Sequence, residues 1–306
     1  MSSEQELSDY YLPGATLLLS LGPNDDLLNV RVIQAFTPFT MSQAILVERS
    51  GQNEKEDSTA RSHQLPEQFL TKIYDPRFYS HRLARHWRPA RPWSLEAESE
   101  AASARRKRGI SRDPYFKASR QPEPEDLPGW EEWYFQNSER QYHAEAAAYG
   151  HLKKLQGSGI PHCYGTGSLQ LSDRTISPHV LLLEFLPDAK SLDLVDLVVP
   201  LSLLQPLLDA VDEFGALGVV HTDLNPGNIL FSPGYQPTRA VIIDFGEAGV
   251  REEEDDLKWA EIVEECADSI WIRKRLQRAL GIDLSNGRPS IDTPSHSWKS
   301  SFLSTI

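Results

Sequence analysis

Two aspartates and one asparagine stand close together in the segments HTDLNPGNIL (221–230) and VIIDFGEA (241–248). They are Asp223, Asn228 and Asp244. Carboxylate and amide oxygens suit magnesium, an ion that keeps several waters and bridges phosphate groups. A further carboxylate can accept the proton of an attacking hydroxyl. The set is therefore typical of phosphoryl transfer, which depends mainly on charge neutralisation and alignment.

Four residues of these segments have expected roles in the site. Asp223 follows the apolar stretch GVV and is the candidate acceptor of the hydroxyl proton. The Pro-Gly pair at 226–227 predicts a turn that brings Asn228 to the metal as a neutral oxygen ligand. Asp244 would give magnesium a carboxylate. His221 is expected to support the loop by hydrogen bonding.

A lysine and a glutamate could complete the site. Lys72, in the strand-like stretch FLTKIYD, is the candidate for contacting the α- and β-phosphates. A helix predicted at 131–156 places Glu145 at the centre of an apolar face, where a carboxylate is costly without a partner. We therefore predict an ion pair between Lys72 and Glu145. The alternatives are an exposed strand lysine and a glutamate satisfied by another group.

Strand patterns lie mostly in the first part of the chain, and helical patterns follow. Apolar alternation predicts strands within 28–48, 67–75, 160–170 and 178–186. Helical spacing predicts helices at 131–156, 201–218 and 255–281. Polar or biased composition predicts a tail or extra edge element at 1–24, a loop at 51–65, a mostly disordered or loosely helical insertion at 84–129 and a disordered tail at 285–306.

Composition limits the possible partners. The chain has 306 residues and a net charge of −13, which argues against nucleic-acid binding as its main role. The apolar runs are too short to span a bilayer, and we expect no membrane association. Two cysteines cannot form a disulfide framework, so we expect the cytoplasm or the nucleus. ARRKR (104–108) fits a nuclear-import or anion-binding patch, but a solvated charge run is the simpler interpretation.

These segments resemble the protein-kinase-like superfamily, in particular the compact atypical kinase-like proteins of fungi, and are also similar to aminoglycoside phosphotransferase-type kinases. The resemblance rests on FTPFT, TKIYDPRF, EAAAYGHLKKLQGSGIP, LLLEFLPDAKSL, HTDLNPGNIL and IIDFGEA. It implies a two-lobed α+β kinase-like fold, with a small β-rich N-lobe (25–186), a reduced and mainly helical C-lobe (187–284), and ATP and Mg²⁺ as cofactors. It also implies that the backbone at Glu184, Phe185 and Leu186 contacts adenine.

Three departures from conventional kinases affect the choice of acceptor. FTPFTMSQ (36–43) stands where a glycine-rich loop is expected, so backbone amides or the hydroxyls of Thr37, Thr40 and Ser42 would have to cover the phosphates. Asn225 replaces the lysine that conventional Ser/Thr kinases carry two residues after the proton acceptor. The chain after Asp244 is too short for a peptide-docking platform.

Three functions are compatible with this sequence. The first, which the sequence favours, is an atypical ATP-dependent protein kinase that phosphorylates a serine or threonine hydroxyl of a protein. The second is a small-molecule kinase of the aminoglycoside or choline type, favoured by Asn225 and the short C-terminal part. The third is a pseudokinase that binds nucleotide without turnover, favoured by the missing glycine-rich loop. Retention of Asp223, Asn228 and Asp244 argues against the third.

Overall fold

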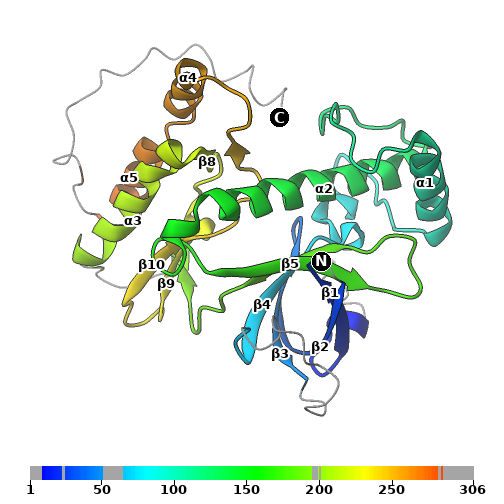
Figure 1. Cartoon of the computed structure of the whole chain (residues 1–306), viewed down its shortest axis with the longest axis horizontal. Helices are drawn as coiled ribbons and strands as arrows, with labels where there is room; N and C mark the ends of the chain where they lie inside the picture. The colour runs from blue at the N-terminus through cyan, green and yellow to red at the C-terminus, as the bar shows by residue number, and fades with distance from the viewer. Residues whose placement is uncertain are drawn as a thin grey trace. The chain divides into compact units, whose positions relative to one another are not determined.

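The computed structural model describes residues 9–22, 25–50, 65–194, 199, 201–281 and 284. They form a mixed α+β protein with a sheet-rich N-terminal part and helices towards the C-terminus (Figure 1). The chain divides into two compact units. Among the described residues, the first combines those up to Tyr142 with Tyr164–Leu183, and the second combines His143–Cys163 with those from Glu184 to Leu284. Within the described residues, every helix is too short or too polar to cross a membrane.

A closed barrel in the order β1-β2-β3-β4-β6-β5 forms the centre of the first unit. Its strands are β1 (Thr16–Leu21), β2 (Asp26–Phe36), β3 (Gln43–Arg49), β4 (Gln68–Ile73), β5 (Cys163–Gln170) and β6 (His179–Leu183). Along β2, Leu28, Val30 and Val32 are buried, and the residues between them are more exposed. This alternation is expected for a sheet with one face inside a core.

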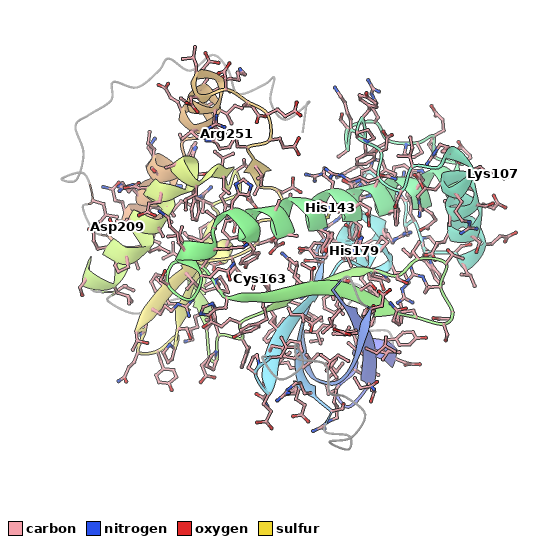
Figure 2. All side chains as sticks on the ribbon, in the orientation of Figure 1. Lys107, His143, Cys163, His179, Asp209 and Arg251 are labelled. Carbon is pink, nitrogen blue, oxygen red and sulfur yellow. The ribbon has the colours of Figure 1, made fainter. Side chains whose placement is uncertain are left out.

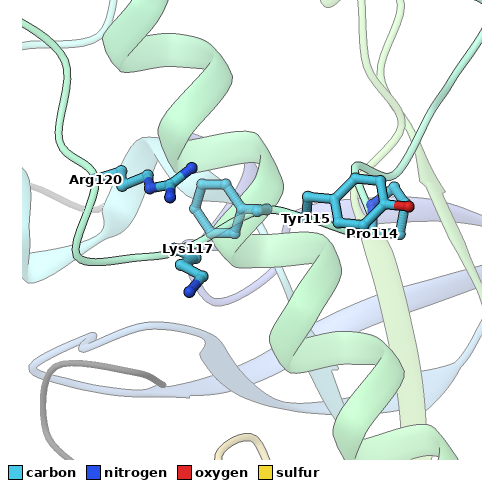
Figure 3. Close-up of a pocket in the computed structure, with 5 residues that line it drawn as sticks. Pro114, Tyr115, Lys117 and Arg120 are labelled. Carbon is cyan, nitrogen blue, oxygen red and sulfur yellow. The ribbon is translucent and has the colours of Figure 1, made fainter.

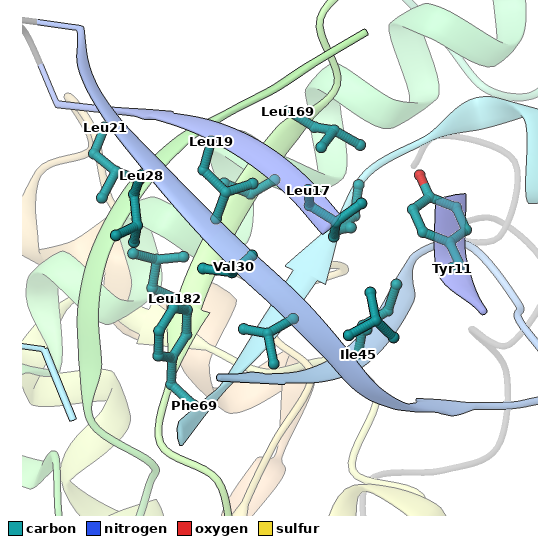
Figure 4. Close-up of a cluster of buried hydrophobic side chains, with 14 of the residues drawn as sticks. Tyr11, Leu17, Leu19, Leu21, Leu28, Val30, Ile45, Phe69, Leu169 and Leu182 are labelled. Atoms are coloured by element: carbon teal, nitrogen blue, oxygen red, sulfur yellow. The ribbon is translucent and has the colours of Figure 1, made fainter. Parts of the chain in front are cut away.

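Apolar side chains from all of these strands fill the barrel (Figure 4). They include Leu17, Leu19, Leu28, Val30, Ile45, Phe69, Leu169 and Leu182. The rings of Tyr11, Phe39 and Phe78 pack edge to face, with centroids 5.2 to 6.1 Å apart. Edge-to-face packing of this kind stabilises beyond the burial of apolar area.

Part of the segment at 1–24, predicted to be a tail or an extra edge element, is a strand inside the barrel. Residues 16–21 form β1, which pairs with β2 on one side and with β5 on the other. The run TLLLSL has the strand period, so its buried leucines become part of the barrel core. Residues 1–8, the loop at 51–64 and the tail at 285–306 lie outside the described residues.

Within the insertion at 84–129, predicted to be mostly disordered or loosely helical, residues 95–108 form helix α1 (Leu95–Arg108), so the disordered alternative is wrong for this part. The Ser94 hydroxyl caps the helix by accepting a hydrogen bond from the Ala97 amide at 3.2 Å. Gly109 ends it with a left-handed φ of 69°. The helix buries little apolar surface beyond its alanines, so a hydrophobic pattern could not reveal it.

Charged side chains hold α1 in the first unit. The side chain of Arg174 is fully buried and donates to Glu98 of α1 and, at 3.2 Å, to Asp75. Glu98 also accepts from Trp93 Nε1 at 2.8 Å and from Thr175 Oγ1 at 2.9 Å. The partners are up to 99 residues apart in sequence. A buried carboxylate is tolerated only when it is paired in this way.

The pKa values of the two carboxyl groups reflect this pairing. Burial alone would raise the pKa of Asp75, but Arg174 and Arg77 outweigh burial and lower it. Burial would also raise the pKa of Glu98, and the bonds from Arg174, Trp93 and Thr175 lower it. Both groups therefore stabilise the fold in their ionised form.

The second unit carries smaller sheets and three helices. Its strands are β7 (Lys190–Ser191), β8 (Val219–Val220), β9 (Ile229–Ser232), β10 (Arg239–Ile242) and β11 (Gly249–Val250). They form a sheet in the order β10-β9-β7 and a β11-β8 pair. The helices are α3 (Leu201–Phe214), α4 (Asp256–Cys266) and α5 (Asp268–Leu280). The apolar face of α3 is buried against α5 and β10.

Two further helix predictions can be compared with the structure. The helix expected at 131–156 is present as α2 (Leu127–His151). The single helix expected at 255–281 is broken at Ala267, whose φ is 52°. On α4, Trp259 is buried, while Leu257 is exposed. The break places Asp268 at the start of α5, where its carboxylate has a separate structural role described below.

Replacement of Arg174 by methionine tests the ionic network. The change removes a cation shared by two buried carboxylates, so we expect the free energy of unfolding to fall by about 3–5 kcal/mol. Chemical denaturation at pH 7 measures this loss. Arg31→Met, which breaks the more exposed pair with Glu48, is the control and should cost less than about 1 kcal/mol. Equal losses in both variants would contradict the proposed importance of the network.

Candidate active site

The loop after β8 folds back on itself. Asn225 Oδ1 accepts a hydrogen bond from the Gly227 amide at 2.8 Å and so begins a short 3-10 turn at Pro226–Asn228. The turn returns Asn228 to Asp223. Nδ2 of Asn228 donates to the Asp223 backbone oxygen at 2.9 Å and to its Oδ2 at 3.2 Å. The predicted turn is present, and it brings two predicted site residues into contact.

The carboxylate of Asp223 is exposed and oriented by amide groups. Its Oδ1 accepts from Asn225 Nδ2 at 3.1 Å, and its Oδ2 accepts from Asn228. Both donors are uncharged, so they fix the orientation of the carboxylate without neutralising it. An exposed and oriented carboxylate is a suitable acceptor for a substrate proton.

Asp244 follows β10 in a conformation that few non-glycine residues adopt. Its φ is 65°, and its Oδ1 lies 3.4 Å from the Gly246 amide. The preceding residue, Ile243, donates its backbone amide to the backbone oxygen of Asn228 at 3.0 Å. This bond joins the loop of Asp244 to the loop of Asn228. Strained backbone of this kind is retained when the surrounding structure requires it.

His221 supports both loops. Its Nε2 donates to the Ile243 backbone oxygen at 3.0 Å, and its Nδ1 accepts from the Asp223 amide at 3.3 Å. These two bonds define the tautomer with the proton on Nε2. The side chain is buried against Phe245, with ring centroids 4.7 Å apart. The supporting role predicted for His221 agrees with this geometry.

Asp268 anchors the start of the loop. Its carboxylate accepts from the backbone amides of His221, at 2.5 Å, and Thr222, at 3.3 Å. Thr222 has a φ of 61° and donates its hydroxyl to the Glu247 backbone oxygen at 2.7 Å. Burial raises the pKa of Asp268, and the two amides offset part of the rise. The sequence around Asp268 does not reveal this role, because the partners of Asp268 lie 46 and 47 residues away.

Acidic groups gather around Tyr149 of α2. Burial raises the pKa of Tyr149 well above its ordinary value, and Glu145, Cys163, Asp244 and Glu184 raise it further. Glu145 is fully buried one helical turn before Tyr149. The structure therefore gathers the predicted Glu145 and Asp244 in one region of the second unit.

Glu184 and Leu186 follow β6 in an extended segment. The Glu184 carboxylate accepts from Arg239 Nη1 at 2.6 Å and from the His162 amide at 2.9 Å. Burial would raise the pKa of Glu184, but these bonds lower it. The Glu184 side chain thus has a structural role, while Leu186 is half-buried. Whether this backbone contacts adenine stays a prediction.

Lys72 lies in β4, opposite Ala44 of β3 and Leu181 of β6. It is 8% exposed, so it is not the exposed strand lysine of the alternative interpretation. Its Nζ lies 5.7 Å from the centroid of the Tyr74 ring. Lys72 belongs to the first unit and Glu145 to the second. Their ion pair therefore stays a prediction.

The turn at 37–42, which replaces a glycine-rich loop, is held by packing. Phe39 is buried in the barrel core, and the Thr40 backbone oxygen accepts from the Ser80 amide at 2.7 Å. The side chains of Thr37 and Thr40 are exposed. Packing at Phe39 can thus fix the position of the turn in place of a backbone shape that needs glycine.

The hydrogen-bonded Asp223–Asn228 pair and the adjoining Asp244 loop form a site with the groups that phosphoryl transfer requires. Residues 164–257 match APH, the phosphotransferase enzyme family, which is part of the protein-kinase-like superfamily. The resemblance inferred from the sequence is confirmed over this stretch. The match supports a phosphotransferase of the kinase-like superfamily. A search of curated proteins finds no match.

Replacement of Asp268 by alanine tests its anchoring role. The change leaves the His221 and Thr222 amides without their acceptor, so we expect a loss of about 2–3 kcal/mol in the free energy of unfolding. Asp268→Asn keeps one oxygen acceptor and should lose less. Asp256→Ala is the matched control, because it also removes a carboxylate at a helix start but one that is 97% exposed. Equal losses in Asp268→Ala and the control would exclude the anchoring role.

Proposed function

We propose that the protein is an ATP-dependent phosphotransferase that uses Mg²⁺ and transfers the γ-phosphate to a hydroxyl group. The bonded pair of Asp223 and Asn228 carries this proposal, together with the 3.0 Å bond from Ile243 that joins their loop to Asp244. The amide oxygen of Asn228 and the carboxylate of Asp244 are hard oxygen ligands and fit magnesium. Bound magnesium would neutralise phosphate charge and align the nucleotide. Asp223 would accept the proton of the hydroxyl.

Lys72 and Glu145 complete the proposed site. In a two-lobed kinase-like fold, Lys72 would contact the α- and β-phosphates. Glu145 would be the ion-pair partner of Lys72. Burial of both side chains supports the assignment, because a buried charge needs an opposite charge or a bound ligand. The backbone from Glu184 to Leu186 would contact adenine. The N-lobe would extend over 25–186 and the C-lobe over 187–284.

The acceptor is proposed as a small-molecule hydroxyl, with a protein serine or threonine as the second candidate. The sequence alone favoured the protein acceptor. Two observations favour the small molecule: the match to the phosphotransferase enzyme family and the geometry of Asn225. Asn225 uses its side chain to orient Asp223 and to begin the turn at 226–228, a role that a lysine could not fill because it lacks an acceptor.

The compartment proposed for the protein is reducing, either the cytoplasm or the nucleus. Cys163 and Cys266 are both free thiols in the structure. Burial raises the pKa of Cys266 to about 11, and nearby Asp268 and Glu265 add to the rise. A thiol of this kind is unreactive at neutral pH.

Asp223→Ala tests the proposed catalytic role. Transfer of labelled γ-phosphate to an amino-sugar and amino-alcohol pool, or to a basic protein, should fall by about 10²- to 10⁴-fold. The affinity for Mg-ATP should stay within about twofold, because Asp223 acts on the acceptor. Asp209→Ala, at an exposed position on α3, is the matched control and should transfer at the wild-type rate. The labelled acceptor identifies the substrate class.

Two outcomes would overturn the proposal. Full transfer by Asp223→Ala would remove Asp223 from the chemistry. Nucleotide binding without transfer by the wild type would instead favour the pseudokinase, a binding module without turnover.

A further inference from the structure

A strongly basic surface lies at the end of α1 and in the loop after it. Residues 105–120 contain seven lysines and arginines and a single acid, Asp113, in a chain whose net charge is −13. We define the basic surface as the exposed side chains of Arg106, Lys107, Arg112, Lys117 and Arg120. Figure 2 shows Lys107 on α1. This segment is positively charged, whereas the rest of the protein is negatively charged.

The loop that carries most of these cations is held in place by α2. The Gln136 side chain donates to the Ser111 backbone oxygen at 3.0 Å and accepts from the Asp113 amide at 2.9 Å. Trp133 Nε1 donates to the Ala118 backbone oxygen at 3.1 Å. The loop is therefore ordered before any partner binds, which lowers the entropy cost of binding.

Neighbouring acids neutralise only part of the charge. Arg105 and Arg108 both pair with Glu132. Among the described residues, none of the five side chains of the basic surface has an ion-pair partner. Cations at the C-terminal end of a helix are expected, because they interact favourably with the helix dipole. This effect does not explain the further cations in the loop that α2 holds in place.

An open hollow with a mixed aromatic and basic lining lies within the basic surface (Figure 3). It is lined by Pro114, Tyr115, Phe116, Lys117 and Arg120. Tyr115 is 83% exposed, and Ile110 nearby in sequence is 52% exposed. Exposed aromatic rings beside cations are typical of binding surfaces rather than of solvated faces.

We propose that the basic surface binds an acidic segment of a partner protein that carries an apolar side chain among its acids. Charge complementarity selects the acids, and the hollow at Tyr115 takes the apolar side chain. A short acidic segment can cover this surface alone. A nucleic acid or an anionic membrane would extend beyond this surface. It would then be repelled by the rest of the protein, because the net charge of the chain is −13. The proposal does not depend on the proposed phosphotransferase activity.

Fluorescence anisotropy with labelled peptides tests this binding. The probes are a peptide of six glutamates around a central tryptophan and the same peptide with serine in place of the tryptophan. The full chain should bind the tryptophan peptide at least about fivefold more tightly, because the apolar side chain fills the hollow. Tyr115→Ala should remove this preference while keeping most of the salt-dependent affinity.

A charge-matched pair of variants separates the surface from the total charge. Reversal to glutamate at Arg112, Lys117 and Arg120 should weaken binding at least about tenfold. Reversal at Lys153, Lys154 and Lys274, which are exposed in the second unit, makes the same change in net charge and should alter binding less than twofold.

The proposal fails if both triple variants weaken binding equally, or if the tryptophan peptide has no advantage over the serine peptide. It also fails if a single-stranded oligonucleotide of equal charge, or vesicles containing phosphatidylserine, bind at least tenfold more tightly than the tryptophan peptide.

Discussion

The geometry of the candidate site depends on the hydrogen bonds that the Asp268 carboxylate accepts from the backbone amides of His221 and Thr222. These bonds fix the point where the chain leaves β8. They also require a carboxylate at the start of α5, which is possible because the chain breaks its helix at Ala267. Since the carboxylate is buried, loss of either side of the interaction leaves polar groups without partners.

From this anchor, contacts extend to the loops that carry Asn228 and Asp244. His221 packs against Phe245 and donates to the Ile243 backbone oxygen, while Ile243 donates its amide to Asn228. Phe245 in turn contacts Tyr149 of α2, with ring centroids 5.5 Å apart. The positions of two loops and one helix are thus linked through one buried cluster of rings. In the proposed reaction, preorganised groups of this kind would lower the barrier to transfer, because they need little rearrangement.

The sequence predicted the parts of the structure that depend on neighbouring residues. The turn that returns Asn228 to Asp223, the helix α2 and the strand around Lys72 all follow from local patterns. The role of Asp268 and the order of α1 were not predicted. Both depend on pairing between charged groups and partners distant in the chain, as in the bond from Arg174 to Asp75. Hydrophobic periodicity does not reveal such pairs. The segments that contain these charged residues have the composition of solvated or disordered chain.

The proposed function depends on Asn228 and Asp244 forming a magnesium-dependent nucleotide site. Calorimetric titration of ATP into the wild type and into Asp244→Ala, each with and without Mg²⁺, tests this dependence. We expect Mg²⁺ to tighten ATP binding to the wild type by at least about tenfold and Asp244→Ala to lose this gain. An equal gain from Mg²⁺ in both proteins would show that the ion is held elsewhere and would exclude the proposed site.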